Sequence, residues 1–270
     1  MKIALFSIGF REKFQAELNR VLQTLNDLKI EITVYEDLAH FTSKDRSVWC
    51  SYEDLKKEKV DFLLSLGGDG TILKSVTLIR DLEIPIIGLN LGRLGFLANV
   101  EKDAFVDHMN RIISGDYFLE DRTLVALSSN YPLFGNTPFA LNEFTILKRD
   151  SSSMVTIHTY LNDNYLSSYW CDGLIISTPT GSTAYNLSCG GPILFPTSKN
   201  IIVTPVSPHN LNVRPLVLPD DVRLSFKIEG RTDQFLCTLD SRKEIIGKNH
   251  DLEIRKGDFG AKLVRFEKEE

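Results

Sequence analysis

Three glycines around one aspartate form the strongest chemical signal in the sequence. The run Gly67-Gly68-Asp69-Gly70-Thr71 follows an apolar segment and precedes a segment with helical spacing. Glycine permits positive φ and close approach of the backbone to a ligand, and free N–H groups at a helix start attract anions. Thr71 adds a hydroxyl or caps the helix. These features favour a phosphate-binding loop over a tight turn that needs glycine only for its own geometry. It is not a P-loop, because no Gly-Lys-Ser/Thr follows.

A longer polar run, residues 172–185, contains a strand that ends in a polar turn and enters a short helix. It offers hydroxyls, a carboxylate, an aromatic face and a glycine for close backbone approach, from Asp172, Thr180, Gly181, Ser182, Thr183 and Tyr185. The hydroxyls and the carboxylate can hydrogen-bond a polar ligand, and a flat tyrosine face suits a base or ring. The alternative is a capped helix with a tyrosine in the core.

Adjacent polar residues, Asn142 and Glu143, interrupt an apolar strand. Because neighbouring strand residues face opposite ways, at least one of them points inward unless the strand ends there. An amide suits an adenine edge, and a carboxylate suits paired hydroxyls. The residues alone leave this pair open between a ligand site and a solvated strand end.

Other segments carry weaker signals. Residues 88–97 form a second glycine-rich strand exit, which lies near the first loop if the two strands are neighbours. Residues 208–216 include His209, for which both a structural and a functional role stay open. Three basic residues are candidate charge partners for phosphate, although surface solvation is the simpler interpretation of each: Arg93, Lys148 and Arg149.

Taken together, these segments resemble the NAD kinase family. The Gly-Gly-Asp-Gly-Thr loop is shared with lipid kinases such as diacylglycerol and sphingosine kinases, and phosphofructokinases carry a close variant. The run at residues 172–185 resembles the NAD kinase signature over its whole length, and lipid kinases lack it. The resemblance extends from Lys2 to about Leu252 and implies a compact enzyme of the bacterial type.

The resemblance implies transfer of a phosphoryl group from ATP, with Mg²⁺ or another divalent cation, to the adenosine-ribose 2′-hydroxyl of NAD, which gives NADP and ADP. It implies that Asp69 is the general base and that Mg²⁺ bridges phosphate oxygens, with no metal ligand assigned in the protein. The implied nucleotide-binding residues are Gly67, Gly68, Gly70, Thr71, Arg93, Phe96, Asn142, Glu143, Asp172, Thr180, Thr183, Ala184 and Tyr185. A homotetramer formed through the β domain, in which a neighbour completes the NAD site, is also implied. The alternatives are a lipid or small-alcohol kinase with the same loop and a non-catalytic NAD-binding sensor.

The sequence departs from the family at two positions. Trp170 stands where relatives vary between small, polar and basic residues, a position linked in the family to the choice of NAD over NADH. A cationic nicotinamide gains from an aromatic face, so we expect a preference for NAD, with core packing of Trp170 as the alternative. Ser241 follows Asp240 where glycine is frequent, and its role is left open.

The pattern along the chain predicts two domains. Strand and helix patterns alternate over residues 1–100, as in a Rossmann-like α/β domain with a parallel sheet, and helical spacing is clearest over residues 11–28 and 71–79. Residues 101–254, joined through a helix near 103–113, form short strands that predict a mostly antiparallel β-sandwich. The resemblance implies that the last residues, from about 255 to 270, return to the first domain, and that NAD and triphosphate meet between the domains.

Composition narrows the class of protein. The chain has 270 residues, 43% hydrophobic and 25% charged, with a net charge of −5. This balance argues against nucleic acid or an anionic membrane as the main partner. We expect a cytoplasmic protein, since no stretch resembles a signal peptide or a membrane span. The four cysteines show no C-x-x-C pair, which predicts reduced thiols and no zinc site.

Overall fold

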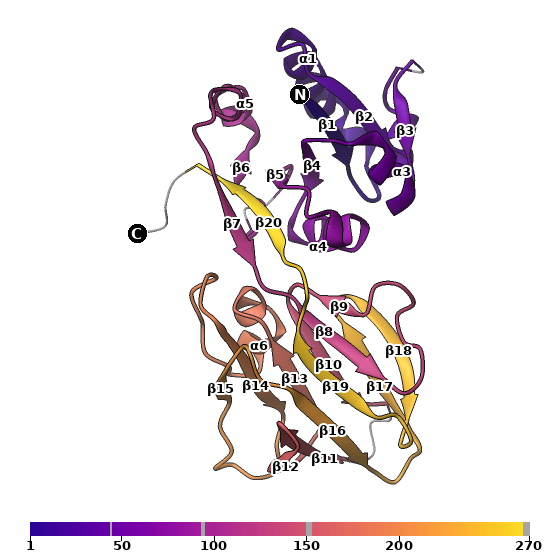
Figure 1. Cartoon of the computed structure of the whole chain (residues 1–270), viewed down its shortest axis with the longest axis vertical. Helices are drawn as coiled ribbons and strands as arrows, with labels where there is room; N and C mark the ends of the chain where they lie inside the picture. The colour runs from indigo at the N-terminus through magenta and orange to yellow at the C-terminus, as the bar shows by residue number, and fades with distance from the viewer. Residues whose placement is uncertain (44, 93–94, 150–152, 267–270) are drawn as a thin grey trace. The chain divides into compact units, whose positions relative to one another are not determined.

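The structure is a computed structural model that describes residues 1–43, 45–92, 95–149 and 153–266 (Figure 1). The chain divides into two compact units: unit 1 holds Met1–Asp121 together with the segment that starts at Ala261, and unit 2 holds Arg122–Gly260. The polypeptide therefore leaves unit 1, builds all of unit 2, and returns.

Unit 1 is built on one sheet of eight strands in the order β3-β2-β1-β4-β5-β20-β7, with β6 paired to β5. The strands are β1 (Lys2–Phe6), β2 (Glu31–Tyr35), β3 (Ser47–Trp49), β4 (Phe62–Gly67), β5 (Ile86–Asn90), β6 (Val100–Glu101), β7 (Phe118–Arg122) and β20 (Ala261–Arg265). Strand β1 pairs in parallel with β2 and β4, and β5 pairs in parallel with β4 and β20. The predicted parallel α/β sheet is thus confirmed.

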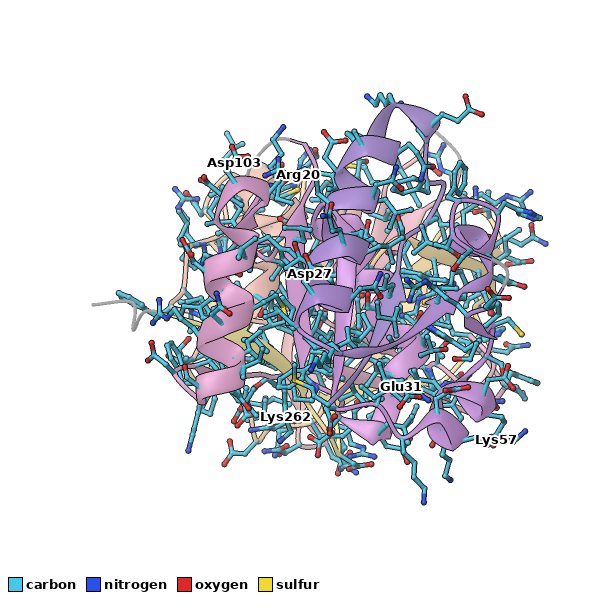
Figure 2. All side chains as sticks on the ribbon, turned by 90° about the horizontal axis from the view of Figure 1, so that it is seen from above. Arg20, Asp27, Glu31, Lys57, Asp103 and Lys262 are labelled. Atoms are coloured by element: carbon cyan, nitrogen blue, oxygen red, sulfur yellow. The ribbon has the colours of Figure 1, made fainter. Side chains whose placement is uncertain are left out.

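Five helices accompany this sheet: α1 (Gln15–Asp27), α2 (Glu36–Ala39), α3 (Tyr52–Glu58), α4 (Asp69–Ile79) and α5 (Phe105–Ser114). Helices α1 and α5 share one buried core with alternate strand residues such as Leu5 and Leu64, since side chains alternate across a strand. In Figure 2, Arg20 of α1 and Asp103, which precedes α5, lie side by side, and their charged groups are 3.6 Å apart. Helix α4 packs on β4 and β5.

Unit 2 consists of two six-stranded antiparallel sheets, ordered β15-β14-β13-β10-β17-β18 and β12-β11-β16-β19-β8-β9. The strands are β8 (Val125–Ser129), β9 (Phe139–Ala140), β10 (Glu143–Lys148), β11 (Val155–Leu161), β12 (Asn164–Cys171), β13 (Gly173–Ser177), β14 (Asn200–Val206), β15 (Leu216–Pro219), β16 (Leu224–Glu229), β17 (Gln234–Leu239), β18 (Arg242–Gly247) and β19 (Leu252–Lys256). Both sheets line one apolar core, in which the rings of Phe144 and Phe226 lie 5.9 Å apart. The predicted β-sandwich is confirmed.

The units do not divide where the sequence pattern suggested. The expected boundary lay near residue 100, whereas the observed division falls after Asp121, and the chain rejoins unit 1 at Ala261. The reason is packing: α5 contributes Met109 and Ile112 to the core of unit 1, and β7 neighbours β20 in its sheet.

Several short elements were not predicted. Helix α3 begins after Ser51, whose hydroxyl accepts from the Asp54 amide, and buries only Leu55. A segment with one buried residue has no apolar period to detect, and the same holds for the four-residue helix α2. Within the described residues, no helix has the length and apolar character that crossing a bilayer requires.

Candidate functional site

The glycine-rich loop joins β4 directly to α4. Helix α4 starts at Asp69, with Gly68 as its N-cap, and both Gly68 and Gly70 are exposed. A Cβ atom added at Gly68 or Gly70 would meet nothing within 4 Å, and neither residue has positive φ. Of the two properties expected of glycine here, positive φ is not used at Gly68 or Gly70. The free space around both residues is compatible with the other, a close approach of a ligand to the backbone.

Gly67 is required by the protein itself. A Cβ atom there would lie 2.2 Å from the Thr71 hydroxyl, so the first glycine allows α4 to start close against the end of β4. The loop therefore combines one glycine needed for internal packing with two that leave backbone open to solvent. Backbone amides at the start of a helix attract anions, and this helix of 11 residues starts at the loop.

The Asp69 carboxylate holds the second glycine-rich segment. Its Oδ2 accepts from the Phe96 amide at 2.9 Å, and its Oδ1 accepts from the Leu97 and Ala98 amides at 3.0 and 3.1 Å. A Cβ atom at Gly95 would lie 2.3 Å from Oδ1, so this glycine makes room for the carboxylate. The two segments were expected to be neighbours if their strands were adjacent, and β4 does pair with β5.

Arg265 holds the same segment from the other side. From strand β20, its guanidinium donates to the Leu97 carbonyl at 3.1 Å and pairs with Glu120 at 2.8 Å, and all three groups are buried. Leu97 thus has its amide fixed by Asp69 and its carbonyl fixed by Arg265. The sequence analysis missed Arg265, whose partner lies 168 residues away. Phe96 is 69% exposed, and the predicted site residue Arg93 lies outside the described residues.

In unit 2, the structure brings Asn142 and Glu143 next to the polar run at residues 172–185. The Asn142 carbonyl accepts from the Thr178 amide at 2.9 Å, and the Thr178 hydroxyl donates to the Leu141 carbonyl at 2.5 Å. A Cβ atom at Gly181 would lie only 2.1 Å from the Asn142 oxygen. The two predicted segments therefore form one packed unit.

The hydroxyls of the polar run are partly engaged inside the protein. A 3₁₀ turn, Thr180–Thr183, leads through Ala184 into helix α6 (Tyr185–Ser188). The buried Arg122 donates to the Thr180 hydroxyl at 3.3 Å, and the Thr183 hydroxyl donates to the Thr180 carbonyl at 3.4 Å. The predicted short helix is present, and Tyr185 is 38% exposed, so its ring is available to a ligand and is not a core residue.

Asp172 already has a charged partner. Its carboxylate lies 2.6 Å from the Lys148 ammonium, on the neighbouring strand β10. The interpretation of Lys148 as a solvated surface cation is therefore wrong. Arg149 is exposed and donates to the Gln234 side chain.

Glu143 is the most perturbed carboxyl of this group. Burial, followed by the nearby Asp240 carboxylate, raises the pKa of Glu143 to about 8, and a hydrogen bond from the Tyr185 amide opposes the shift. Among the described residues, its Oε2 has no hydrogen-bond partner. A carboxyl group that is buried beside another carboxylate takes up a proton near neutral pH.

This shift predicts a pH-dependent gain of stability for Glu143→Gln. Below pH 4.5, Glu143 is protonated in both the folded and the unfolded chain. Between pH 4.5 and about 8 it ionises only in the unfolded chain, so the unfolding free energy of the wild type falls as the pH rises. Above about pH 8 this loss of stability is complete. Glutamine does not titrate. We expect the variant's advantage in unfolding free energy to grow across this window to at most about 5 kcal/mol. Urea unfolding from pH 5 to 9 measures it. Glu12→Gln, at an exposed residue, is the control, and a constant difference between wild type and Glu143→Gln would contradict the prediction.

Trp170 faces solvent. It lies on β12, is 50% exposed, and its ring centroid is 4.2 Å from that of His209, whose amide also donates to the Trp170 carbonyl at 2.9 Å. The alternative that Trp170 packs into the sandwich core is not supported by this exposure. Its partner His209 had no assigned role from sequence.

Metal-ligating groups are sparse in the described part of the chain. No group of three or more His, Cys, Asp or Glu side chains is placed to hold a metal ion there. All four cysteines are free thiols, as predicted, and Cys171 and Cys237 are buried. A divalent cation would therefore fit this protein as a companion of a polyphosphate, which supplies most of its ligands, as Mg²⁺ prefers.

A glycine-rich loop with a fixed carboxylate at the start of a helix, on a parallel sheet followed by a β-sandwich, is an arrangement suited to a phosphotransferase. Two family models match the chain: the ATP-NAD kinase N-terminal domain over residues 12–117 and the ATP-NAD kinase C-terminal domain over residues 141–266.

Individual relatives agree with these matches. The chain is 54% identical to an NAD kinase of Cytophaga hutchinsonii over 77% of this chain and 71% of that protein. It is 40% identical to an NAD kinase of Flavobacterium psychrophilum over 100% of this chain and 94% of that protein. A solved NAD kinase from Archaeoglobus fulgidus in complex with ATP matches with a TM-score of 0.78 and 25% identity, over 100% of this chain and 94% of that one. The chain belongs to the NAD kinase family.

Proposed function

We propose that this enzyme transfers the γ-phosphoryl group of ATP to the 2′-hydroxyl of the adenosine ribose of NAD, forming NADP and ADP. The observation that carries the proposal is the placement of Asp69, a carboxylate held by three backbone amides at the first residue of a helix, between the exposed glycines Gly68 and Gly70. The ATP complex of the archaeal relative supports ATP as the donor.

In this proposal, unit 1 supplies the phosphate site and the base. The open backbone at Gly68 and Gly70, together with Thr71, would hold the triphosphate. A carboxylate has about four acceptor positions, and three of those on Asp69 are filled by backbone amides. One position therefore remains, on Oδ2, for the proton of an attacking hydroxyl. Asp69 would align that hydroxyl and take its proton as the phosphoryl group transfers.

Mg²⁺ would enter with the triphosphate. It would supply positive charge that neutralises the phosphate oxygens. The protein's own contribution is to orient the phosphates with backbone donors and to keep the Asp69 carboxylate in place.

Unit 2 supplies the acceptor site in this proposal. Asn142, Glu143, Thr180, Thr183, Ala184 and Tyr185 lie along two segments that pack on one another, which supports a shared role in holding NAD. Asp172 would act through its ion pair with Lys148, which fixes the carboxylate at the residue that joins β12 to β13. The exposed face of Tyr185 suits stacking against a base or ring.

A coupled assay tests the function. Protein, Mg²⁺-ATP and NAD are incubated, and any NADP formed is measured with an NADP-specific dehydrogenase. NADP production that depends on all three components supports the proposal. Consumption of ATP with diacylglycerol and none with NAD would point to a lipid kinase, and NAD binding without turnover would point to a sensor.

We also propose a homotetramer that works in the cytoplasm. Several large apolar side chains of unit 2 are exposed, among them Ile193, Phe195 and Leu211 at 65%, 72% and 84%, and further copies of the chain would cover them. The four free thiols fit a reducing compartment. Sedimentation should give four chains at micromolar concentration, and a fully active stable monomer would contradict the assembly.

Trp170 is proposed to select oxidised NAD. Its exposed ring offers a face to the cationic nicotinamide, which gains about 0.5–2 kcal/mol from such contact, whereas reduced nicotinamide is uncharged. Trp170→Gly should lower the NAD-to-NADH ratio of kcat/KM by about 2- to 30-fold. Tyr165→Gly, at a 63% exposed aromatic on the same strand, is the matched control and should leave the ratio unchanged. An unchanged ratio in Trp170→Gly would remove its role in selection.

A further inference from the structure

A tight turn between β17 and β18 places an aspartate next to the backbone of Asn142 and Glu143. Asp240 is the first residue of this two-residue turn and has a positive φ of 52°, which is uncommon for any residue except glycine. Two-residue hairpin turns use positive φ at a central position, and aspartate adopts it more readily than most other residues.

The Asp240 carboxylate accepts three consecutive backbone amides. Its Oδ2 accepts from Leu141 at 3.1 Å, and its Oδ1 accepts from Asn142 at 2.8 Å and Glu143 at 3.2 Å. The Asp240 amide returns a bond to the Glu143 carbonyl at 3.0 Å. Hydrogen bonds to a carboxylate are stronger than neutral ones, so this turn sets the path of the backbone between β9 and β10.

The same three residues are held from the opposite side by the polar run. Thr178 bonds to the Leu141 and Asn142 carbonyls, and Gly181 packs against the Asn142 backbone. The segment of residues 141–143 therefore has its amides fixed by Asp240 and two of its carbonyls fixed by Thr178. A shift at Asp240 would displace the side chains of Asn142 and Glu143 and the turn that carries Thr180.

Arg242 secures the hairpin on which Asp240 lies. Its guanidinium donates to the Thr137 carbonyl at 2.5 Å and to the Phe139 carbonyl, which lie just before the segment. Burial raises the pKa of Asp240, and its bonds from the backbone amides and the charge of Arg242 oppose that shift. The hairpin thus contacts the chain both before and at residues 141–143.

We propose that Asp240 is a positioning residue for the NAD site: it sets the direction of Asn142 and Glu143 through the backbone of residues 141–143 and does not itself touch the substrate. This inference rests on the proposed function, because it assigns a role toward the acceptor.

The arrangement has an electrostatic signature. The titratable or charged groups that act on Glu143 are Asp240 of the hairpin, Tyr185 of α6, and Arg242, which acts through Asp240. Both oxygens of Asp240 already accept hydrogen bonds, whereas Oε2 of Glu143 has no partner among the described residues, so the proton of this pair resides on Glu143. Removing the negative charge of Asp240 lowers the pKa of Glu143.

Asp240→Asn tests the proposal. The variant keeps the size of the side chain but turns one acceptor into an N–H donor that faces a backbone amide. We expect KM for NAD to rise by about 10-fold or more and KM for ATP to stay within about twofold. The acid–base midpoint in the pH profile of KM for NAD should move to lower pH, which a purely structural defect would not produce.

Asp220→Asn is the matched control. Asp220 is a buried aspartate of the same unit, and it pairs with Lys256 at 2.6 Å, away from residues 141–143. Its loss should lower the melting temperature without changing KM for NAD or the pH profile. NADP production by the wild type is measured first. If the wild type makes no NADP, the proposed function is contradicted, and the result says nothing about the positioning role of Asp240.

Two outcomes would overturn the proposal. One is an Asp240→Asn variant with unchanged KM for NAD and unchanged pH profile. The other is a loss confined to kcat, which would make Asp240 a catalytic residue. If Asp240→Asn does not fold, Asp240→Glu keeps the charge and shifts its position. Faster hydrogen exchange at the amides of residues 141–143, with a higher KM for NAD, then supports the role, and wild-type exchange at those amides contradicts it.

Discussion

Asp69→Asn is expected to lower kcat by about 10²–10⁴-fold while NAD affinity stays within a few-fold, because positioned bases contribute that much to rate. The substitution preserves size and leaves the Asn oxygen to accept from the Leu97 and Ala98 amides. Only the bond from the Phe96 amide is lost, since the new amide group donates where Oδ2 accepted. Steady-state kinetics and NAD titration measure the two quantities.

The Asp69 carboxylate also holds the amides of residues 96–98. A second variant is therefore needed to separate its role as a base from its role in placing this segment. Gly95→Ala keeps the Asp69 carboxylate but places a methyl group 2.3 Å from Oδ1, which disturbs its placement. We expect a smaller loss of kcat in this variant than in Asp69→Asn. If Asp69→Asn retains more than about a tenth of wild-type turnover, Asp69 is not the base. Equal losses in both variants would assign Asp69 to loop placement alone.

Gly181→Ala should abolish NAD binding and destabilise unit 2. The new Cβ atom would lie 2.1, 2.5 and 2.7 Å from three backbone atoms of Asn142, and backbone cannot move aside as a side chain tip can. Asn142 would have to give up its bond from the Thr178 amide, and its amide is itself tied to Asp240. Overpacking of this kind costs about 1–3 kcal/mol or more in stability.

Calorimetric titration with NAD and thermal unfolding report on this variant together. We expect no NAD binding at concentrations that saturate the wild type, with a lower melting temperature. Gly247→Ala is the same substitution in the same unit, where the nearest atom to the new Cβ would be the Asp233 carbonyl at 3.3 Å. It should bind NAD normally. A Gly181→Ala variant with wild-type NAD affinity would show that Asn142 does not take part in the acceptor site.

The fold class could be predicted because its signals are local. Alternating buried residues along β11 and the helical spacing of Leu18, Leu22 and Leu25 in α1 are visible in any short window of sequence. The glycine-rich loop could likewise be assigned, since its residues are adjacent. The sequence could not tell which property of glycine is used there: neither Gly68 nor Gly70 has positive φ, and both have free space around them.

The supporting residues could not be predicted, because their partners are distant in the chain. Asp240 lies 97 residues or more from the amides that it holds, and Arg265 lies 168 residues from Leu97. No periodicity connects such positions. The sequence did contain a signal for Asp240, because a two-residue turn between strand-like runs suits an aspartate with positive φ. The departure from the family pattern, however, lies at the neighbouring Ser241 and not at Asp240.

The return of the chain to unit 1 orders its folding during synthesis. Strand β20 and Arg265 follow the whole of unit 2 along the polypeptide, yet they complete the sheet of unit 1 and hold the Leu97 carbonyl. During synthesis, residues 1–121 leave the ribosome first, but the sheet of unit 1 cannot be completed until these late residues follow. The sandwich of unit 2 can fold as soon as Gly260 has emerged. The second unit to emerge is thus the first that can finish, and the sheet that carries Asp69 is completed last.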